Sequence, residues 1–284
     1  MVVRGSIGGF IGAFLFLSKA VFATITACPT TAPGTPINGL DQLTKGCAEI
    51  DKSFTNFNIV ATSGATPSSN DIFIYTSGTP PVGNTLGPVS LFFSTPGPGP
   101  IWSVANGASM SETVDYQVSA NTGGAYSGGT YPTPATPGLF WAINQIVFTP
   151  AITINNFGGG TNNKATITMA FCLNAATTTG CAPSSSGTIV ATYSGTSTAV
   201  YSCTFSGCVS GTSNTINLAG SVTQIAFAET VAITAFNLAG NTVTVNNIRN
   251  QFGEFAAGVP EPSTFVLIGS GLLLVALVKR RFYG

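Results

Sequence analysis

A period of two in the placement of apolar residues is the feature of this sequence that most limits its fold. In residues 113–119 the residues Val114, Tyr116 and Val118 alternate with polar neighbours, and residues 164–172 and 242–246 repeat the pattern. Such alternation is typical of half-buried β-strands, and the Thr, Val, Ile and Phe residues that dominate these runs favour strands. Similar runs predict further strands at residues 54–62, 71–76, 89–94, 139–148, 151–155, 188–194, 199–203, 222–228 and 231–236.

Segments rich in glycine and proline separate the predicted strands, at residues 78–87, 96–100, 121–138 and 158–160. Helical periodicity is weak between the chain ends, and only residues 40–50 are compatible with one short helix. Many short strands with frequent breaks predict an all-β fold, an antiparallel β-sandwich of the jelly-roll-like or Ig-like kind. We expect this body to extend over residues 24–258.

Residues 1–23 have the organisation of a secretory signal peptide. Arg4 supplies a basic start, residues 7–17 form an apolar run, and small residues precede a cleavage site between Ala23 and Thr24. The run is too short to span a membrane permanently. We therefore predict a signal helix that is removed after export by the Sec machinery; a buried N-terminal helix is the alternative.

Six cysteines lie between the two terminal segments, at Cys28, Cys47, Cys172, Cys181, Cys203 and Cys208. An even count in an exported chain predicts disulfides, and six cysteines allow fifteen complete pairings. Proximity in the sequence favours Cys28–Cys47, Cys172–Cys181 and Cys203–Cys208. Lipidation of Cys28 is an alternative, but about ten residues separate it from the apolar run, which favours ordinary cleavage.

Residues 259–284 contain three parts in a defined order. A proline-rich start comes first, at Val259, Pro260, Glu261 and Pro262. An uncharged apolar run at residues 265–278 follows, and a basic cluster comes after it, at Lys279, Arg280 and Arg281. As a helix the run is about 21 Å long, shorter than the roughly 30 Å hydrocarbon core of a bilayer. The prolines keep the preceding chain extended, and the basic cluster holds its end on the cytoplasmic side. We expect a short transmembrane helix that pauses the chain in the membrane until a protease cuts it.

This arrangement resembles the PEP-CTERM sorting domain over residues 259–281, although the chain continues past the basic cluster with Phe282, Tyr283 and Gly284. The resemblance implies processing near the Pro-Glu-Pro triplet by exosortase, a membrane-embedded cysteine protease. It also implies export in a Gram-negative bacterium, transient anchoring in the inner membrane, and a final place at the cell surface or outside the cell. Many such bacteria make exopolysaccharide, which is therefore an expected partner. A permanent anchor that is never cleaved is the alternative.

A second, shorter resemblance lies in residues 51–57, Asp-Lys-Ser-Phe-Thr-Asn-Phe, which are similar to a segment of some PEP-CTERM cargo proteins. Asp51 and Lys52 are expected to end a loop, and Phe54 to begin the first core strand. We interpret the segment as structural.

The charged residues argue against most enzymatic and nucleic-acid functions. They make up 6% of the chain, so its electrostatic field is too weak to attract a nucleic acid. There is no histidine, which excludes Ser-His-Asp and Cys-His catalysis and imidazole metal ligands. We therefore expect no catalytic residue, no cofactor and no metal site.

Paired carboxylates are the remaining catalytic option, since two of them can hydrolyse glycosides. The candidate pairs are Glu112 with Asp115 and Glu229 with Glu254. The odd spacing of the first pair predicts opposite faces of one strand. We interpret all four residues as solvated surface charges.

The sequence as a whole predicts an exported cell-surface or extracellular-matrix protein without catalytic activity. The first alternative is a carbohydrate-binding sandwich with aromatic residues as a stacking platform, namely Trp102, Tyr126, Tyr131 or Trp141, although Trp141 lies in an apolar strand and fits a core position. The second alternative is a carboxylate-dependent glycosidase.

Overall fold

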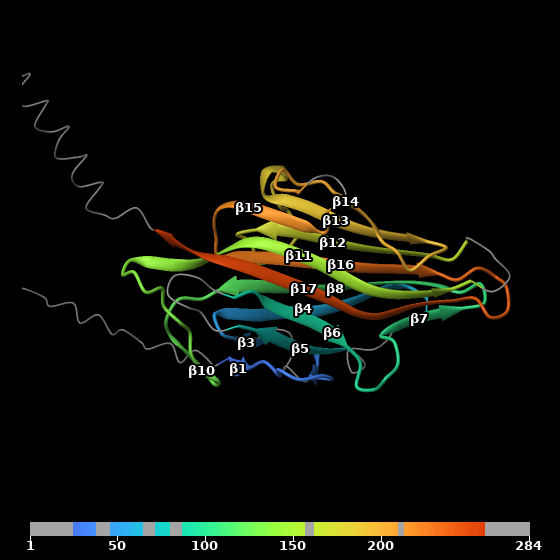
Figure 1. Cartoon of the computed structure of the whole chain (residues 1–284), viewed down its shortest axis with the longest axis horizontal. Coiled ribbons are helices and arrows are strands. Elements are labelled where there is room, and N and C mark those ends of the chain that lie inside the picture. The colour runs from blue at the N-terminus through green and yellow to red at the C-terminus, as the bar shows by residue number, and fades with distance from the viewer. Residues whose placement is uncertain are drawn as a thin grey trace, which may run out of the picture.

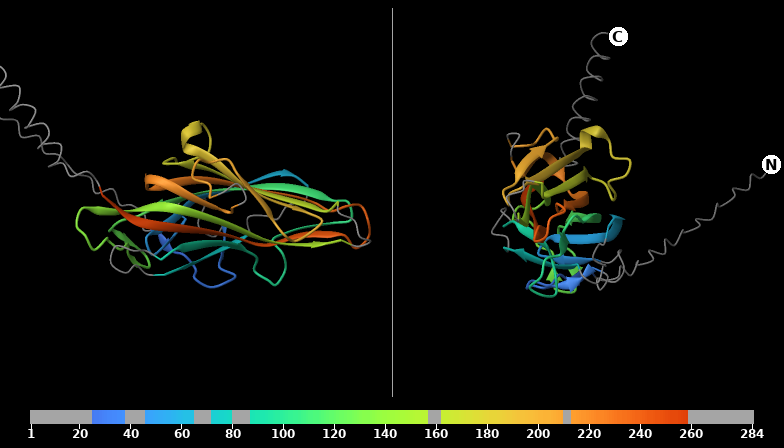
Figure 2. Two further views of the ribbon diagram at one scale, coloured as in Figure 1. Left: turned by 45° about the horizontal axis from the view of Figure 1, so that its top comes forward. Right: turned by 90° about the vertical axis from the view of Figure 1, so that its right-hand side faces the viewer.

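The computed structural model describes residues 25–37, 46–64, 72–79, 87–156, 162–209 and 213–258. Within them two large β-sheets lie face to face and form a sandwich that is elongated along its strands (Figure 1). Figure 2 shows the same body turned about its long axis and from one end. The all-β, antiparallel class predicted from the sequence is confirmed.

The eight-stranded sheet contains, in spatial order, β1 (Thr26–Ala27), β3 (Cys47–Glu49), β4 (Lys52–Ser63), β8 (Ser109–Ala120), β16 (Gln224–Thr234), β12 (Lys164–Leu173), β13 (Ser186–Ser194) and β14 (Val200–Cys203). Its pairs are antiparallel, except that β1 runs parallel to β3. Some neighbours in this sheet come from distant parts of the chain: residues 109–119 of β8 pair with residues 224–234 of β16.

The seven-stranded sheet contains, in spatial order, β15 (Thr215–Val222), β11 (Leu139–Asn155), β17 (Thr242–Gly258), β6 (Val89–Ser94), β5 (Phe73–Gly78) and β2 (Thr35–Pro36). Its seventh strand, β7 (Trp102–Ala105), pairs with the first residues of β17. Outside the two sheets lie a hairpin of β9 (Ala125–Tyr126) and β10 (Gly129–Thr130) and a 3-10 turn at Pro183–Ser185. β17 is a central strand of 17 residues that pairs with β11 from end to end.

Inward-facing apolar residues of both sheets form one hydrophobic core. Aromatic rings contact each other across the sandwich, with Phe54 of β4 and Phe252 of β17 at 6.0 Å and Tyr116 of β8 and Phe93 of β6 at 5.6 Å between centroids. Phe227 of β16 lies 5.0 Å from Tyr116 and 5.6 Å from Phe252. Aromatic side chains bury large areas, so this group holds the middle of the two sheets together.

The strand predictions agree with the structure best where alternation is strict. Residues 113–119, 164–172 and 242–246 lie in β8, β12 and β17, and the predicted strand at 89–94 has the bounds of β6. The predicted strands at 139–148 and 151–155 form the single strand β11. Pro150 stays inside that strand because the register with β17 shifts between Ala151 and Ile152, and irregularities of this kind accommodate proline.

Other predictions need correction. Residues 222–228 and 231–236 contribute mainly to one strand, β16, and the strands β7, β15 and the second half of β17 were not predicted. The short helix compatible with residues 40–50 is wrong for residues 47–49, which form β3. Cys47 is there paired with Phe54 of β4 and bonded to Cys28, and these tertiary contacts favour an extended backbone.

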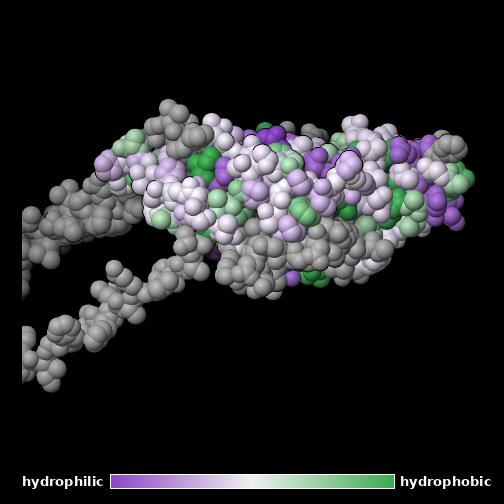
Figure 3. Space-filling model, turned by 90° about the horizontal axis from the view of Figure 1, so that it is seen from below, coloured by the Kyte–Doolittle hydropathy of each residue, from purple (hydrophilic) through white to green (hydrophobic). Residues whose placement is uncertain are grey.

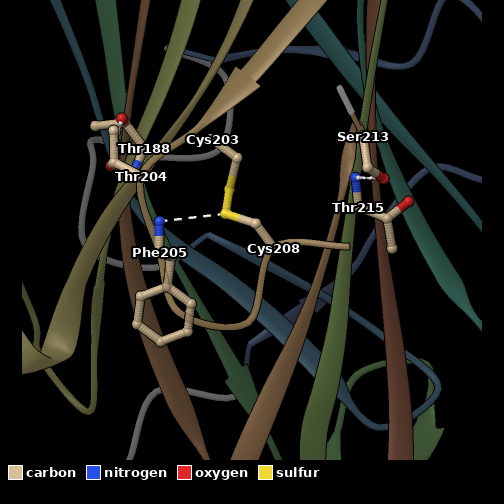
Figure 4. The surroundings of a disulfide bond; sticks show 7 residues. All are labelled: Thr188, Cys203, Thr204, Phe205, Cys208, Ser213 and Thr215. Carbon is tan, nitrogen blue, oxygen red and sulfur yellow. Dashed lines mark hydrogen bonds between the residues drawn. A yellow bond between two sulfur atoms is a disulfide. The ribbon is translucent and has the colours of Figure 1, made fainter. Parts of the chain in front are cut away.

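Three disulfides join Cys28 to Cys47, Cys172 to Cys181 and Cys203 to Cys208, the pairs that sequence proximity favours. Figure 4 shows the third of them, where the Phe205 N–H donates to Cys208 Sγ at 3.2 Å. Cys203 ends β14 and Cys208 forms a β-bridge with Ile216 of β15. This disulfide therefore fastens an edge strand of one sheet to an edge strand of the other.

In the part of the chain that the structure describes, no helix is both long and apolar enough to cross a membrane. The predicted signal helix at residues 1–23, the cleavage pair Ala23 and Thr24, and the predicted transmembrane segment at residues 265–278 lie outside the described residues.

Candidate functional site

The segment of residues 51–57 joins the first long strand of the body to its last strand. Lys52 is fully buried, and its Nζ donates to Asp51 Oδ2 at 2.9 Å and forms an ion pair with Glu254 of β17. Two residues further along β4, Phe54 packs against Phe252. We call Asp51, Lys52 and Glu254 the Lys52 cluster. Its contacts hold the final residues of β17 against β4.

Burial sets the charge behaviour of the Lys52 cluster. Burial raises the pKa of Glu254, the attraction of Lys52 lowers it, and the neighbouring Asp51 raises it further. A buried ion pair compensates only part of the desolvation of its charges, and the loss of one partner is strongly destabilising. The cluster therefore fixes the geometry between β4 and β17 while all its members are present.

A second buried acid, Glu229 of β16, lies in the centre of the sandwich. Its Oε1 accepts a hydrogen bond from Asn250 Nδ2 at 2.6 Å, and the same amide donates to the Tyr116 hydroxyl at 2.8 Å. Burial raises the pKa of Glu229 to about 8, although its hydrogen bonds to Asn250 and Tyr116 lower it. At neutral pH this carboxyl group is therefore mainly protonated and uncharged, which suits its apolar surroundings.

The third buried acid is Glu112 of β8, which accepts a hydrogen bond from Trp102 Nε1. The prediction that Glu112, Glu229 and Glu254 are solvated surface charges is wrong, because they are 1%, 1% and 8% exposed. The prediction that Glu112 and Asp115 occupy opposite faces is confirmed by the alternating burial along β8.

The period-two alternation of the sequence could have predicted the burial of Glu112 and Glu229. Glu112 has the same parity as Val114 and Tyr116, and Glu229 has the same parity as Phe227 and Val231. In this structure Glu229 and Glu254 each contact their own polar partners inside the core. Both side chains therefore form part of the buried contacts between the two sheets.

The aromatic residues of the carbohydrate-binding alternative are mainly buried, and the core position considered for Trp141 is confirmed. Trp102 and Trp141 are 1% and 0% exposed, and Trp141 Nε1 donates to the Pro132 carbonyl at 3.0 Å. Tyr131 is buried and packs on the half-buried Tyr126 at 4.9 Å. Three of the four side chains are buried and Tyr126 is half-buried, so together they do not form an exposed stacking platform.

A different aromatic row lies on the outer face of the seven-stranded sheet. Tyr75 of β5 stacks on Phe92 of β6 at 4.5 Å with nearly parallel planes, and the Arg249 guanidinium of β17 lies 5.6 Å from the Phe92 centroid. All three are half-buried, and the sequence analysis did not single them out. Their outward parity in alternating strands could have identified them. Because the rings cover each other, they stabilise the pairing of strands.

Apolar residues are otherwise dispersed over the described surface. On the face that Figure 3 shows, they lie singly among hydrophilic residues and do not merge into a broad patch. The large apolar residues with the greatest exposure are Val60, Val200, Val209, Phe236 and Leu238, and of these Phe236 and Leu238 lie in the same turn. Scattered exposure of this kind is ordinary for a protein surface.

Comparison with known families identifies the end of the chain. Residues 258–281 match the family model of the PEP-CTERM protein-sorting motif. The chain carries a PEP-CTERM sorting motif. The motif marks an exported protein that is sorted through the membrane, and it is consistent with an exosortase substrate. Neither a curated protein nor a solved structure was found to match the chain.

The PEP-CTERM motif begins at the last residue of a core strand. Gly258 ends β17 and pairs with Leu139 of β11, and Glu254 of the Lys52 cluster lies four residues earlier. Figure 1 shows β17 running along the body to the end opposite the turn at residues 236–241. The sorting residues Val259, Pro260, Glu261 and Pro262 and the basic residues Lys279, Arg280 and Arg281 lie outside the described residues.

Proposed function

We propose that this is an exported cell-surface or extracellular-matrix protein without catalytic activity, whose C-terminal sorting signal is cleaved in the membrane. The observation that carries the proposal is the match of residues 258–281 to the PEP-CTERM motif. The signal-peptide pattern of residues 1–23 fits the same route through the Sec machinery. Three disulfides also fit it, because such bonds persist in oxidising compartments outside the cytoplasm.

The tail supplies the physical means of delivery in this proposal. The apolar run at residues 265–278 pauses the chain in the inner membrane, and the basic cluster after it resists translocation. Extended backbone before the run, at Pro260 and Pro262, gives an exosortase-type protease a strand to bind. A cut at this place leaves β17 whole, since β17 ends at Gly258.

We propose that the protein is not a catalyst because its most buried acidic residues are engaged in contacts within the core. The strongly buried carboxyl groups of Glu112, Glu229 and Glu254 each contact a polar partner in the core. The resemblance to PEP-CTERM carriers favours an exopolysaccharide matrix as the surroundings of the mature protein.

Intact-mass analysis tests the delivery. Protein from the cell surface or medium should lack residues 265–284, and a strain without the processing protease should hold full-length precursor in its inner membrane. Replacement of Pro260 and Glu261 by alanine should have the same effect in the wild-type strain. Mature surface protein that keeps Lys279, Arg280 and Arg281 in both strains would establish a permanent anchor and refute the proposal.

Incubation of the purified protein with a panel of polysaccharides tests the lack of catalysis. We expect no release of reducing sugar. Reproducible cleavage that is abolished by Glu112→Gln or Glu229→Gln would show the protein to be a glycosidase.

A further inference from the structure

The outer face of the eight-stranded sheet contains a groove of about 390 Å³ that is lined by both polar and apolar atoms. Asn56 and Asn58 of β4 and Asp115 of β8 line one side of it, and residues 176–179, which follow β12, line the other. The volume lies within the range of about 300–1,000 Å³ that is usual for small-molecule sites. The groove lies on the side of β4 that faces away from the Lys52 cluster.

A β-bulge in β4 directs two asparagines into this groove. The register between β4 and β8 shifts between Thr55 and Asn58, and Asn56 has a φ of 58°. Asparagine tolerates this left-handed conformation better than most residues do. As a result Asn56 and Asn58 are both exposed on the outer face, although Phe57 between them is 1% exposed. Bulges commonly re-aim side chains beside binding sites.

The opposite wall of the groove is held in place without a ligand. This wall belongs to the segment of residues 173–180, which the disulfide Cys172–Cys181 closes into a loop. In the same segment the Asn174 N–H donates to the Gln224 carbonyl at 2.6 Å. Three consecutive threonines, Thr177 to Thr179, line the groove from this segment, and their hydroxyl groups make no hydrogen bond to another described residue. A wall that is already ordered loses little entropy when a ligand binds.

The small side chain of Ala228, the neighbour of Asp115 on β16, leaves open space beside the Asp115 carboxylate. Asp115 pairs with Asn58 on one side and with Ala228 of β16 on the other, and the short alanine side chain leaves the carboxylate uncovered there. Burial raises the pKa of Asp115, whereas its hydrogen bond with Asn58 lowers it. Asn58 therefore positions the carboxylate that faces the groove.

The lining side chains limit the chemistry of a ligand. Amides, hydroxyls and one carboxylate can donate and accept many hydrogen bonds, which suits a ligand rich in hydroxyl groups. Among the described residues no lysine or arginine lines the groove, so there an anionic ligand would meet only the charge of Asp115. A single carboxylate is too few for Ca²⁺, which takes six to eight oxygen ligands. Tyr116 and Phe227 also border the groove, but they are 2% and 1% exposed and offer no stacking surface.

We propose that this groove binds one or two residues of an uncharged glycan. Asp115 accepts hydrogen bonds from sugar hydroxyls, the exposed asparagines donate and accept, and the threonine wall contacts the opposite edge of the sugar. The site is distinct from the aromatic platform expected from the sequence. Glycan binding in the groove is a function additional to the export and sorting proposed above, and it does not depend on them.

Saturation-transfer NMR on the purified secreted protein tests the proposal with four neutral disaccharides: maltose, cellobiose, lactose and mannobiose. We expect signal transfer to at least one of them, followed by titration to obtain its dissociation constant. Asn58→Ala and Thr178→Val should each weaken binding about tenfold, the loss expected for one or two hydrogen bonds. Thr192→Val is the matched control, because Thr192 is an exposed threonine of β13 in the same sheet and does not line the groove. Thermal unfolding of all three variants verifies that they are folded.

Three results would overturn the proposal. The first is no saturation transfer to any of the four disaccharides. The second is binding that the groove variants and the Thr192→Val control affect equally. The third is tighter binding of a glucuronate-containing disaccharide or of Ca²⁺ than of every neutral disaccharide. Intact-mass analysis of the same variants separates this test from delivery, since normal tail processing is expected in all of them.

Discussion

At the scale of single residues, the protein uses its few charges inside the fold. Asp51, Lys52, Glu112, Glu229 and Glu254 are all buried, although only 6% of the chain is charged. Charged residues are rarely buried without partners, and each of these has a polar or charged contact across or within the sandwich. The surface is consequently hydrated mainly by hydroxyl and amide groups. The stability of the fold depends on the protonation of the buried carboxyl groups.

The first prediction concerns the pH dependence of stability that Glu229 causes. Its pKa is raised from 4.5 to about 8 in the folded protein, so the folded state retains a proton that the unfolded chain releases above about pH 4.5. The free energy of unfolding should be highest below that pH, fall as pH rises towards 8, and then level off. One pKa unit corresponds to about 1.4 kcal/mol, so the rise from 4.5 to about 8 makes the total fall from Glu229 on the order of 5 kcal/mol.

Glu229→Gln tests this prediction, because an amide cannot ionise. Urea unfolding should show the variant more stable than the wild type at pH 9 and within about 1 kcal/mol of it at pH 4.5. Parallel profiles of the two proteins between these pH values would contradict the assignment.

The second prediction concerns the Lys52 cluster. Lys52→Met leaves the buried carboxyl groups of Asp51 and Glu254 without their cation and should lower the free energy of unfolding by about 3–5 kcal/mol. Adding Glu254→Gln removes one of those acids and should recover part of the loss, which a double-mutant cycle measures. The exposed Lys164→Met should change stability by less than about 0.5 kcal/mol. Additive effects of the Lys52 and Glu254 changes would mean that the two residues are not coupled.

Sequence parity explains what could and could not be predicted at this scale. Alternation placed Val114 and Tyr116 inside correctly, and it also placed Glu112 inside, but average burial preferences assigned that residue to the surface. The partner of a buried acid is unpredictable from spacing, because Trp102 and Lys52 reach Glu112 and Glu254 across the sandwich, from the opposite sheet. Spacing does not predict the groove either, because Asn58 and Asp115 come together through the register of β4 with β8.

At the scale of elements, alternation in the sequence predicts many of the strands, but it does not predict the bulges and disulfides that shape and connect them. Strict alternation predicted β12 nearly to its ends and most of β8, whereas β7 and β15 were missed. β17 was predicted only at its start because its second half contains Arg249, Asn250 and Gly253, which strands disfavour in general. Tertiary pairing with β11 over the full strand outweighs those preferences.

The third prediction ranks two disulfides by the loops they close. Cys28 and Cys47 are separated by 19 positions, and Cys203 and Cys208 by 5. Loop-closure entropy predicts a loss of about 3 kcal/mol when Cys28 and Cys47 are both replaced by alanine and about 2 kcal/mol for the second pair. Non-reducing peptide mapping should first find all three local pairs in secreted protein. Urea unfolding then measures both variants, and a larger loss for the Cys203–Cys208 pair would show that its connection of the two sheet edges dominates over entropy.

At the scale of the whole molecule, β17 connects the core of the body to the PEP-CTERM motif. It is a central strand that contacts β11, β6 and β7, its inward residues reach β4 and β16, and the motif starts at its last residue. The folded body and the sorting signal therefore adjoin without a separate linker. Removal of the tail should leave the body intact only if the cut falls beyond Gly258.

The last prediction follows from that boundary and compares two shortened chains. A chain that ends at Gly258 keeps every described strand and should unfold at the same temperature as the naturally processed protein. A chain that ends at Gly253 loses Glu254 and the five pairs from Leu139↔Gly258 to Ile143↔Glu254. It should be destabilised by roughly 3 kcal/mol or more, because Lys52 loses a buried partner and several ladder hydrogen bonds disappear. Thermal unfolding of the two purified proteins decides between these outcomes. Equal stability would mean that the last residues of β17 belong to the sorting signal and not to the body, whereas instability of both chains would mean that the body needs residues of the tail.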